Sequence, residues 1–203
     1  MSRPYGGRLP EARSADRRGR LVQAGIELVG THGVSALTMR AVCREAQLSQ
    51  KFFYESFTDT EQLLHEVYRT TLDDARHVIG AAAAAATDRS ARTAAGVDAA
   101  ARLVRTDPRV CRILLMEPIA DLRLRHFVRD FLADAFGRPR TETEVGPLRA
   151  KMHYATTIGA IISLFIEWSE GNLGEDRDAF VTYVTEMLMA SPVAAANAGI
   201  LAP

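Results

Sequence analysis

Residues 37–64 read LTMRAVCREAQLSQKFFYESFTDTEQLL, and this stretch decides how the chain is interpreted. A short amphipathic helix is expected from Thr38, which can cap it, to about Ala46. A turn of about three residues around Gln47 follows, and Ser49 then caps a second short helix. Two short helices joined by such a turn are the layout of a helix-turn-helix, whose second helix enters the major groove of DNA.

The side chains of this stretch fit that layout. Small residues in the first short helix allow close packing, and the polar and aromatic residues after Ser49 can face a DNA groove. The positive ends of the helix dipoles at Thr38 and Ser49 favour phosphate. The candidate DNA-contacting residues are Thr38, Arg40, Ser49, Gln50, Lys51, Phe52 and Tyr54. A purely structural three-helix unit is the alternative, but a core alone does not require the exposed residues 50–52.

Across three helices, about residues 17 to 68, the sequence resembles the tetracycline-repressor (TetR) family of transcriptional regulators. The matching positions are Gly33, Leu37, Thr38, Met39, Arg40, Leu48, Ser49, Phe53, Tyr54, Phe57, Glu61, Leu63 and Leu64. The resemblance implies an all-α homodimer with an N-terminal three-helix helix-turn-helix domain and a C-terminal helical ligand-binding and dimerisation domain. It also implies the roles of single residues: Thr38 and Tyr54 contact phosphates, Gln50, Lys51 and Phe52 face bases, and Phe53 and Phe57 form the core of the motif.

The sequence departs from the family pattern at three positions. Family members commonly have glycine where Gln47 and Lys51 stand, and lysine where Thr60 stands. Thr60 removes one expected phosphate contact, and Lys51 can add one elsewhere. If Gln47 adopts a positive φ in the turn, we expect a strain of roughly 1 kcal/mol.

The periodicity predicts an all-α chain of about nine helices. We expect a flexible basic arm over 1–16, the helix-turn-helix domain over 17–68, a ligand-binding and dimerisation domain over 69–190, and a tail over 191–203. Asp88 and Asp107-Pro108 are expected to open helices, and Pro118 to end one. Further helices are expected over about 119–136, 146–170 and 175–190. The alanine run at 81–86 either continues a helix or forms a loose connection.

Charge is distributed unevenly along a chain whose formal net charge is +0. Residues 1–55 contain nine Lys or Arg against five Asp or Glu, which leaves this segment at +4 and favours a polyanionic partner there. The arginines near its start, Arg13, Arg17, Arg18 and Arg20, are interpreted either as an arm that reaches phosphates or the minor groove, or as a solvated tail.

Two further groups of residues are candidates in the C-terminal part. Met116, Phe127, Phe131, His153 and Thr157 are candidates for the lining of a ligand pocket, with His153 and Thr157 as its polar groups. Each of them could equally be a core residue. Small residues at four-residue spacing indicate a dimer contact, and an intramolecular helix crossing is the alternative. The expected interface residues are Ala155, Gly159, Ile162, Ser163, Trp168, Val184 and Leu188.

Other classes of function find little support. We see no catalytic, phosphate-binding or dinucleotide-binding motif and therefore expect no enzyme and no cofactor. The spacing of His65, His77, His126 and His153 does not fit a metal site, and Cys43 and Cys111 are expected to be reduced and buried. We expect a cytoplasmic, DNA-binding repressor that a small, mainly apolar ligand releases from operator DNA. The alternative is a DNA-binding regulator of the same fold without a small-molecule inducer.

Overall fold

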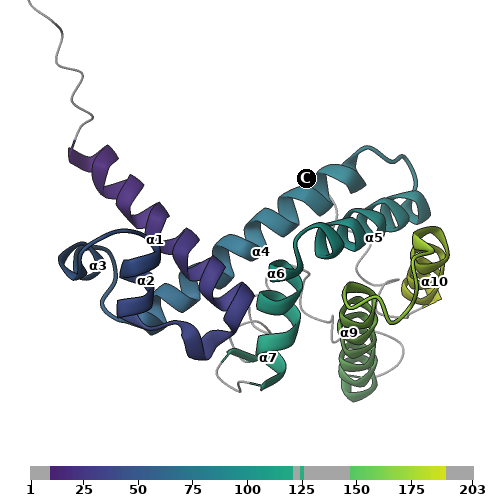
Figure 1. Cartoon of the computed structure of the whole chain (residues 1–203). Coiled ribbons are helices and arrows are strands. Elements are labelled where there is room, and N and C mark those ends of the chain that lie inside the picture. Colours follow the sequence, from purple (N-terminus) through teal and green to yellow (C-terminus); the bar gives the residue numbers. More distant parts are fainter. Residues whose placement is uncertain (1–9, 121–123, 126–146, 191–203) are drawn as a thin grey trace, which may run out of the picture. The chain divides into compact units, whose positions relative to one another are not determined.

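The computed structural model describes residues 10–120, 124–125 and 147–190, and every regular element in those ranges is helical (Figure 1). The expected all-α class is therefore confirmed. The chain divides into two compact units, Met1–Thr70 and Thr71–Pro203, so the boundary lies inside helix α4, Thr60–Ala84. Most of the expected helix over 119–136 and the whole tail over 191–203 lie outside the described residues. No described helix is long and apolar enough to cross a membrane.

Helix α1 of the first unit begins earlier than the sequence analysis placed it. It spans Pro10–His32, so residues 10–16, expected to belong to a flexible arm, are helical. Proline suits the first position of a helix because its fixed φ is already helical and no hydrogen-bond partner is needed there. The helix ends before Gly33, whose φ of 84° permits the turn into the short 3-10 helix η1, Val34–Ala36.

The core of the first unit forms where α1 meets the first half of α4. Gly25 marks the point of closest approach, because a Cβ atom placed there would lie 2.6 Å from Cγ2 of Val67. The apolar stripe of α1 and the aromatic residues of the motif complete this core, which includes Leu21, Val22, Leu28, Val29, Val42, Phe53, Phe57, Leu63, Val67 and Tyr68.

The two helices of the motif, α2 (Met39–Glu45) and α3 (Gln50–Ser56), are seven residues long each. Thr38 caps α2 as expected, with its Oγ1 accepting a hydrogen bond from the amide of Ala41 at 3.2 Å. Helix α4 begins after Asp59, whose carboxylate accepts from the amide of Gln62 at 2.8 Å. This hydrogen bond is the main reason why the pKa of Asp59 lies below its usual value.

The turn between α2 and α3 depends on a strained residue. Gln47 has a φ of 52° and is the only non-glycine residue with positive φ in the described part of the chain. Its amide donates to the carbonyl of Arg44, and the next amide, that of Leu48, donates to the carbonyl of Cys43. The condition for strain at this position, a positive φ at Gln47, is therefore met.

The second unit starts with the rest of α4, which runs through the alanine stretch as far as Ala84. The helices that follow are α5 (Arg89–Thr106), α6 (Pro108–Cys111), the π-helical turn η2 (Arg112–Met116), α7 (Glu117–Ala120), α9 (Pro147–Ser169) and α10 (Arg177–Ala190). Asp88 and Asp107 cap α5 and α6 as expected, each accepting a backbone hydrogen bond from the first turn.

The helix break expected at Pro118 does not occur. The chain stays helical from Pro108 to Ala120, with Pro118 inside α7. In an α-helix the proline ring would collide with the carbonyl of the residue four positions earlier, Leu114. Leu114 lies in the π-helical turn η2, where the wider coil leaves more room, and the helix therefore continues past the proline.

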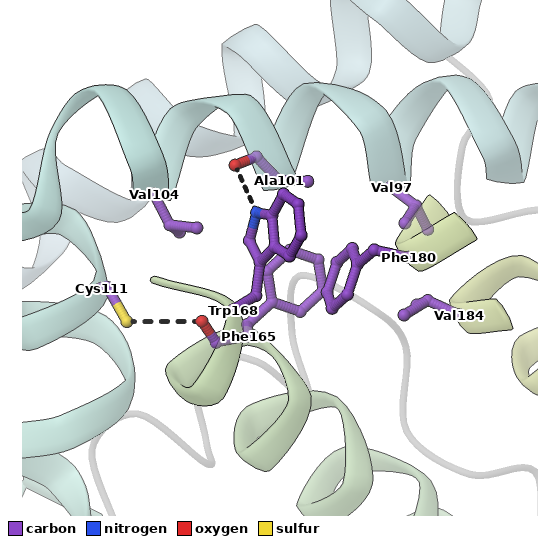
Figure 2. Packing of buried hydrophobic residues seen from close by; sticks show 8 residues of the cluster. All are labelled: Val97, Ala101, Val104, Cys111, Phe165, Trp168, Phe180 and Val184. Atoms are coloured by element: carbon purple, nitrogen blue, oxygen red, sulfur yellow. Dashed lines mark hydrogen bonds between the residues drawn. The ribbon is translucent and has the colours of Figure 1, made fainter. Parts of the chain in front are cut away.

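Helix α5 packs against both α9 and α10, and an aromatic cluster fills the space between them (Figure 2). The ring of Trp168 stacks on Phe180 with centroids 4.6 Å apart, and its indole N–H donates to the carbonyl of Ala101 at 3.1 Å. Arg105 covers the indole at 4.7 Å and donates to the carbonyl of Trp168. These contacts fix the end of α9 against α5.

Replacing Gln47 with glycine should stabilise the protein by about 1 kcal/mol, because glycine adopts positive φ without a steric penalty. The change can be measured as the free energy of unfolding in urea, followed by circular dichroism. The matched control is Arg44→Gly in the neighbouring helix α2, which should destabilise by about the same amount. A loss of stability in Gln47→Gly would contradict the interpretation that this residue is strained.

Candidate DNA-binding surface

Helix α3 presents two different faces. Phe53 and Phe57 are fully buried, one helical turn apart, with ring centroids separated by 6.0 Å. Gln50, Lys51 and Tyr54 are exposed on the other face, and the side chain of Tyr54 is 60% accessible. The edge of the Tyr54 ring contacts Phe53, which holds the phenol in place while its hydroxyl remains on the surface. The helix therefore offers one amide, one ammonium and one phenol group to a partner.

The other predicted contact residues lie next to this face. Thr38 and Arg40 are exposed at the start of α2. Ser49 occupies the position before α3, but its hydroxyl makes no capping hydrogen bond. Phe52 is half-buried, because the guanidinium of Arg17 covers its ring at 4.5 Å.

The arginines of α1 do not form a separate arm. Arg18 donates to the carbonyl of Ser56 at 2.7 Å and stacks over Phe57 at 4.2 Å, while Arg20 donates to the carbonyl of Ala46. Both acceptors lie at helix C-termini, where the carbonyl groups lack helical partners and attract cations. These two arginines fix α2 and α3 onto α1. For Arg18 and Arg20, the interpretations as an arm that reaches phosphates and as a solvated tail are therefore both wrong.

Arg18 also links the motif to α4. Its guanidinium lies 3.4 Å from the carboxylate of Glu66, which Arg69 contacts at 2.7 Å. The hydrogen bond from Arg69, with a smaller contribution from Arg18, keeps the pKa of Glu66 below its usual value. Glu66 is therefore ionised at neutral pH and holds Arg18 in place.

Sequence reasoning missed one residue of this surface. Glu55 lies one turn after Lys51 on α3, and its carboxylate is 3.9 Å from the Lys51 ammonium and 3.6 Å from the Arg17 guanidinium. The spacing of four residues between a lysine and a glutamate is a sequence signal that could have identified the pair. A carboxylate thus lies among the groups expected to contact DNA.

The candidate pocket residues of the second unit are only partly described. Met116 lies on η2, and His153 and Thr157 lie on α9, which packs against η2. All three are half-buried, and Met116 packs against the aromatic cluster around Trp168. Phe127 and Phe131 lie outside the described residues.

The candidate interface residues divide into two groups. Ala155, Gly159 and Ser163 are exposed on α9, and Ile162 and Leu188 are half-buried. Trp168 and Val184 are 2% and 0% exposed within the single chain. Their side chains pack inside the second unit and are not available to a partner. Trp168 and Val184 were expected at the interface, and their burial contradicts that expectation.

The described residues give no support for metal or thiol chemistry. No group of three or more His, Cys, Asp or Glu side chains among them could hold a metal ion. Cys43 and Cys111 are free and buried, and burial raises the pKa of both thiols. A raised pKa leaves little of the reactive thiolate at neutral pH.

The family model of bacterial regulatory proteins, tetR family, matches residues 21–67, which include α2, α3 and the α1–α4 core. The chain belongs to the TetR family. It is a DNA-binding transcriptional regulator, and this family consists of regulators rather than enzymes. The match covers the helices that form the predicted helix-turn-helix. A search of curated protein sequences finds no match.

Solved structures share the fold over most of the chain. The fatty acid degradation regulator FadR from Bacillus halodurans is 14% identical, with a TM-score of 0.67 over 92% of this chain and 98% of its own. A TetR family regulator from Marinobacter aquaeolei VT8 is 19% identical, with a TM-score of 0.60 over 87% and 95%. The multidrug binding protein EbrR, complexed with malachite green, is 19% identical, with a TM-score of 0.58 over 85% and 98%. At these identities the likeness concerns the fold alone.

Proposed function

We propose that this TetR-family regulator reads its operator with the exposed face of α3. The observation that carries the proposal is the division of that helix into a buried face of Phe53 and Phe57 and an exposed face of Gln50, Lys51 and Tyr54. Lysine and the tyrosine hydroxyl suit phosphate oxygens, whereas Gln50 can form two hydrogen bonds to adenine. The ring of Phe52, which is half-buried under Arg17, suits a thymine methyl group.

Lys51→Ala should weaken DNA binding and reduce the slope of log K against log salt by about one, because one phosphate contact is lost. Tyr54→Phe should weaken binding by a few-fold, and Gln50→Ala should change base preference. Binding is measured by fluorescence anisotropy on a duplex selected from a random pool by the native protein. The matched control is Lys151→Ala, which removes the chain's other lysine from α9 of the second unit. An unchanged salt slope in Lys51→Ala would contradict the placement of α3 on DNA.

We propose that the regulator binds DNA as a homodimer through α9 and α10. The row of small residues Ala155, Gly159 and Ser163 is exposed along α9, and two large apolar side chains, Met152 and Tyr183, are exposed at 62% and 59%. Small residues at four-residue spacing let a second helix approach closely. A dimer of this kind would place two α3 helices about 34–36 Å apart, which matches one turn of DNA.

Gly159→Leu should dissociate the dimer and reduce DNA binding with it. No described atom lies within 4 Å of a Cβ atom placed at Gly159, and a partner helix packed on this face would meet the added side chain. The control is Gly80→Leu on α4, where the space around the Cβ position is equally open. Sedimentation velocity at micromolar concentration measures the change. A native monomer, or a Gly159→Leu dimer as tight as the native one, would contradict this interface.

We propose that the protein is a repressor and that a small, mainly apolar ligand bound in the second unit releases it from DNA. The proposal is supported by the half-buried positions of Met116, His153 and Thr157 on two packed elements, and by the shared fold with EbrR, which is complexed with malachite green. His153 or Thr157 would orient the ligand with one hydrogen bond. Release requires the ligand to bind one conformation more tightly than the other.

Thr157→Ala should raise, by about tenfold, the concentration of ligand needed to release DNA, while ligand-free DNA binding stays unchanged. The probes are malachite green and a set of uncharged aromatic and alkyl compounds, tested for release of the selected duplex. Thr156→Ala is the matched control, because it removes the same side chain from the adjacent position of α9, where Thr156 is exposed and Thr157 is half-buried. If Thr157→Ala and Thr156→Ala need the same ligand concentration to release DNA, the ligand does not contact Thr157. If no probe releases DNA, a regulator without a small-molecule inducer becomes the better interpretation.

A further inference from the structure

The surface around α3 contains an anion among its cations. Glu55 is the only acidic residue of α3, and its two carboxylate oxygens face different partners: Oε1 faces the Lys51 ammonium at 3.9 Å and Oε2 faces the Arg17 guanidinium at 3.6 Å. Arg17 is held over this surface by its stacking on Phe52. One carboxylate therefore bridges two cations that come from different helices.

We propose that Glu55 occupies the place of a DNA phosphate in the free protein and competes with DNA for Arg17 and Lys51. The inference rests on the proposed binding of DNA by α3. The Lys51 ammonium can rotate away from Glu55 towards a phosphate, because the Lys51 side chain is 79% exposed. Arg17 is 25% exposed and stays stacked on Phe52, so a phosphate reaches its guanidinium when the Glu55 side chain, which is 41% exposed, turns away. Binding of DNA then exchanges a carboxylate for phosphate oxygens.

The charge of the first unit makes such competition effective. Residues 1–70 contain ten Lys or Arg and eight Asp or Glu, so their net charge is only +2. Arg18 and Arg20 are already engaged with backbone carbonyls. Arg17 and Lys51 are two of these ten cations, and a carboxylate that engages both lowers the affinity for DNA of any sequence.

Two other roles for Glu55 give different results. A glutamate that accepts a hydrogen bond from the amino group of cytosine would contribute to sequence preference. A carboxylate that simply adds negative charge to the surface would act without any specific coupling to Arg17 or Lys51. The experiment therefore has to distinguish competition for Arg17 and Lys51 from cytosine recognition and from a general effect of the negative charge.

The test is Glu55→Gln, measured for binding to a random-sequence duplex and to the selected duplex across a range of salt concentrations. Competition predicts about a fivefold gain in affinity for both duplexes at low salt, and a salt slope steeper by about one to two. The same substitution in an Arg17→Gln/Lys51→Gln background should leave affinity unchanged, because the competing cations are absent. The matched control is Glu45→Gln, which removes one exposed carboxylate from α2 and should have a smaller effect.

Three results would overturn the inference. The gain could persist in the Arg17→Gln/Lys51→Gln background, Glu45→Gln could match it, or only the ratio between the two duplexes could change. A fourth result concerns the proposed function: if Arg17→Gln/Lys51→Gln binds the random duplex as tightly as the native protein, α3 does not face DNA. If that variant binds more weakly while Glu55→Gln leaves native affinity unchanged, the Glu55 inference alone fails.

Discussion

Attachment to α1 is the constraint on which the rest of the first unit depends. Helices α2 and α3 are seven residues long, about half the length at which an isolated helix becomes stable in water. They exist because they pack on a 23-residue helix that buries Leu21 and Val29 completely. The absence of a side chain at Gly25 lets Val67 of α4 approach α1 closely, since a Cβ atom there would lie 2.6 Å from its Cγ2. The position of α3 is thus fixed by contacts behind it.

Hydrogen bonds from two arginines of α1 to the C-terminal ends of α2 and α3 complete this attachment. The guanidinium groups of Arg18 and Arg20 bind carbonyl groups at the ends of α3 and α2, which helical geometry leaves without partners. Each guanidinium keeps its positive charge, but part of its hydrogen-bonding capacity is used within the protein. The positive charge of this segment therefore also serves to hold the motif together.

Local chemistry in the sequence predicted much of this structure. The resemblance to the TetR family implied the burial of Phe53 and Phe57, and its common glycine at position 47 raised the question of a positive φ at Gln47. Thr38, Asp88 and Asp107 are caps that depend only on their own first turn. Each of these features is determined within a few residues.

The wrong sequence-based predictions concern residues whose contact partners are distant in sequence, or a backbone geometry that is less common. Nothing near Arg18 shows that its acceptor is a carbonyl 38 positions away, and nothing near Trp168 shows that its indole bonds to Ala101. Pro118 was expected to end a helix, but the π-helical turn before it accommodates the ring. The roles of Tyr54 on DNA and of Gly159 in a dimer lie beyond a single chain, so neither the sequence nor the fold alone decides them.

Large apolar side chains are exposed in both units, and in the second unit Val78, Ile119 and Leu173 are among them. Among the described residues of the first unit, Tyr54 is the only large apolar side chain that is exposed, and it lies on α3. In the second unit Leu148, Met152 and Tyr183 are exposed on α9 and α10. The first unit has a net charge of only +2. In the proposed dimer, joining two such units would turn the second DNA contact into an intramolecular step with a high effective concentration. In the proposed dimer, the contact between α9 and α10 of the two chains would contribute more to operator affinity than any one residue of α3, because separating the chains would remove a whole half-site.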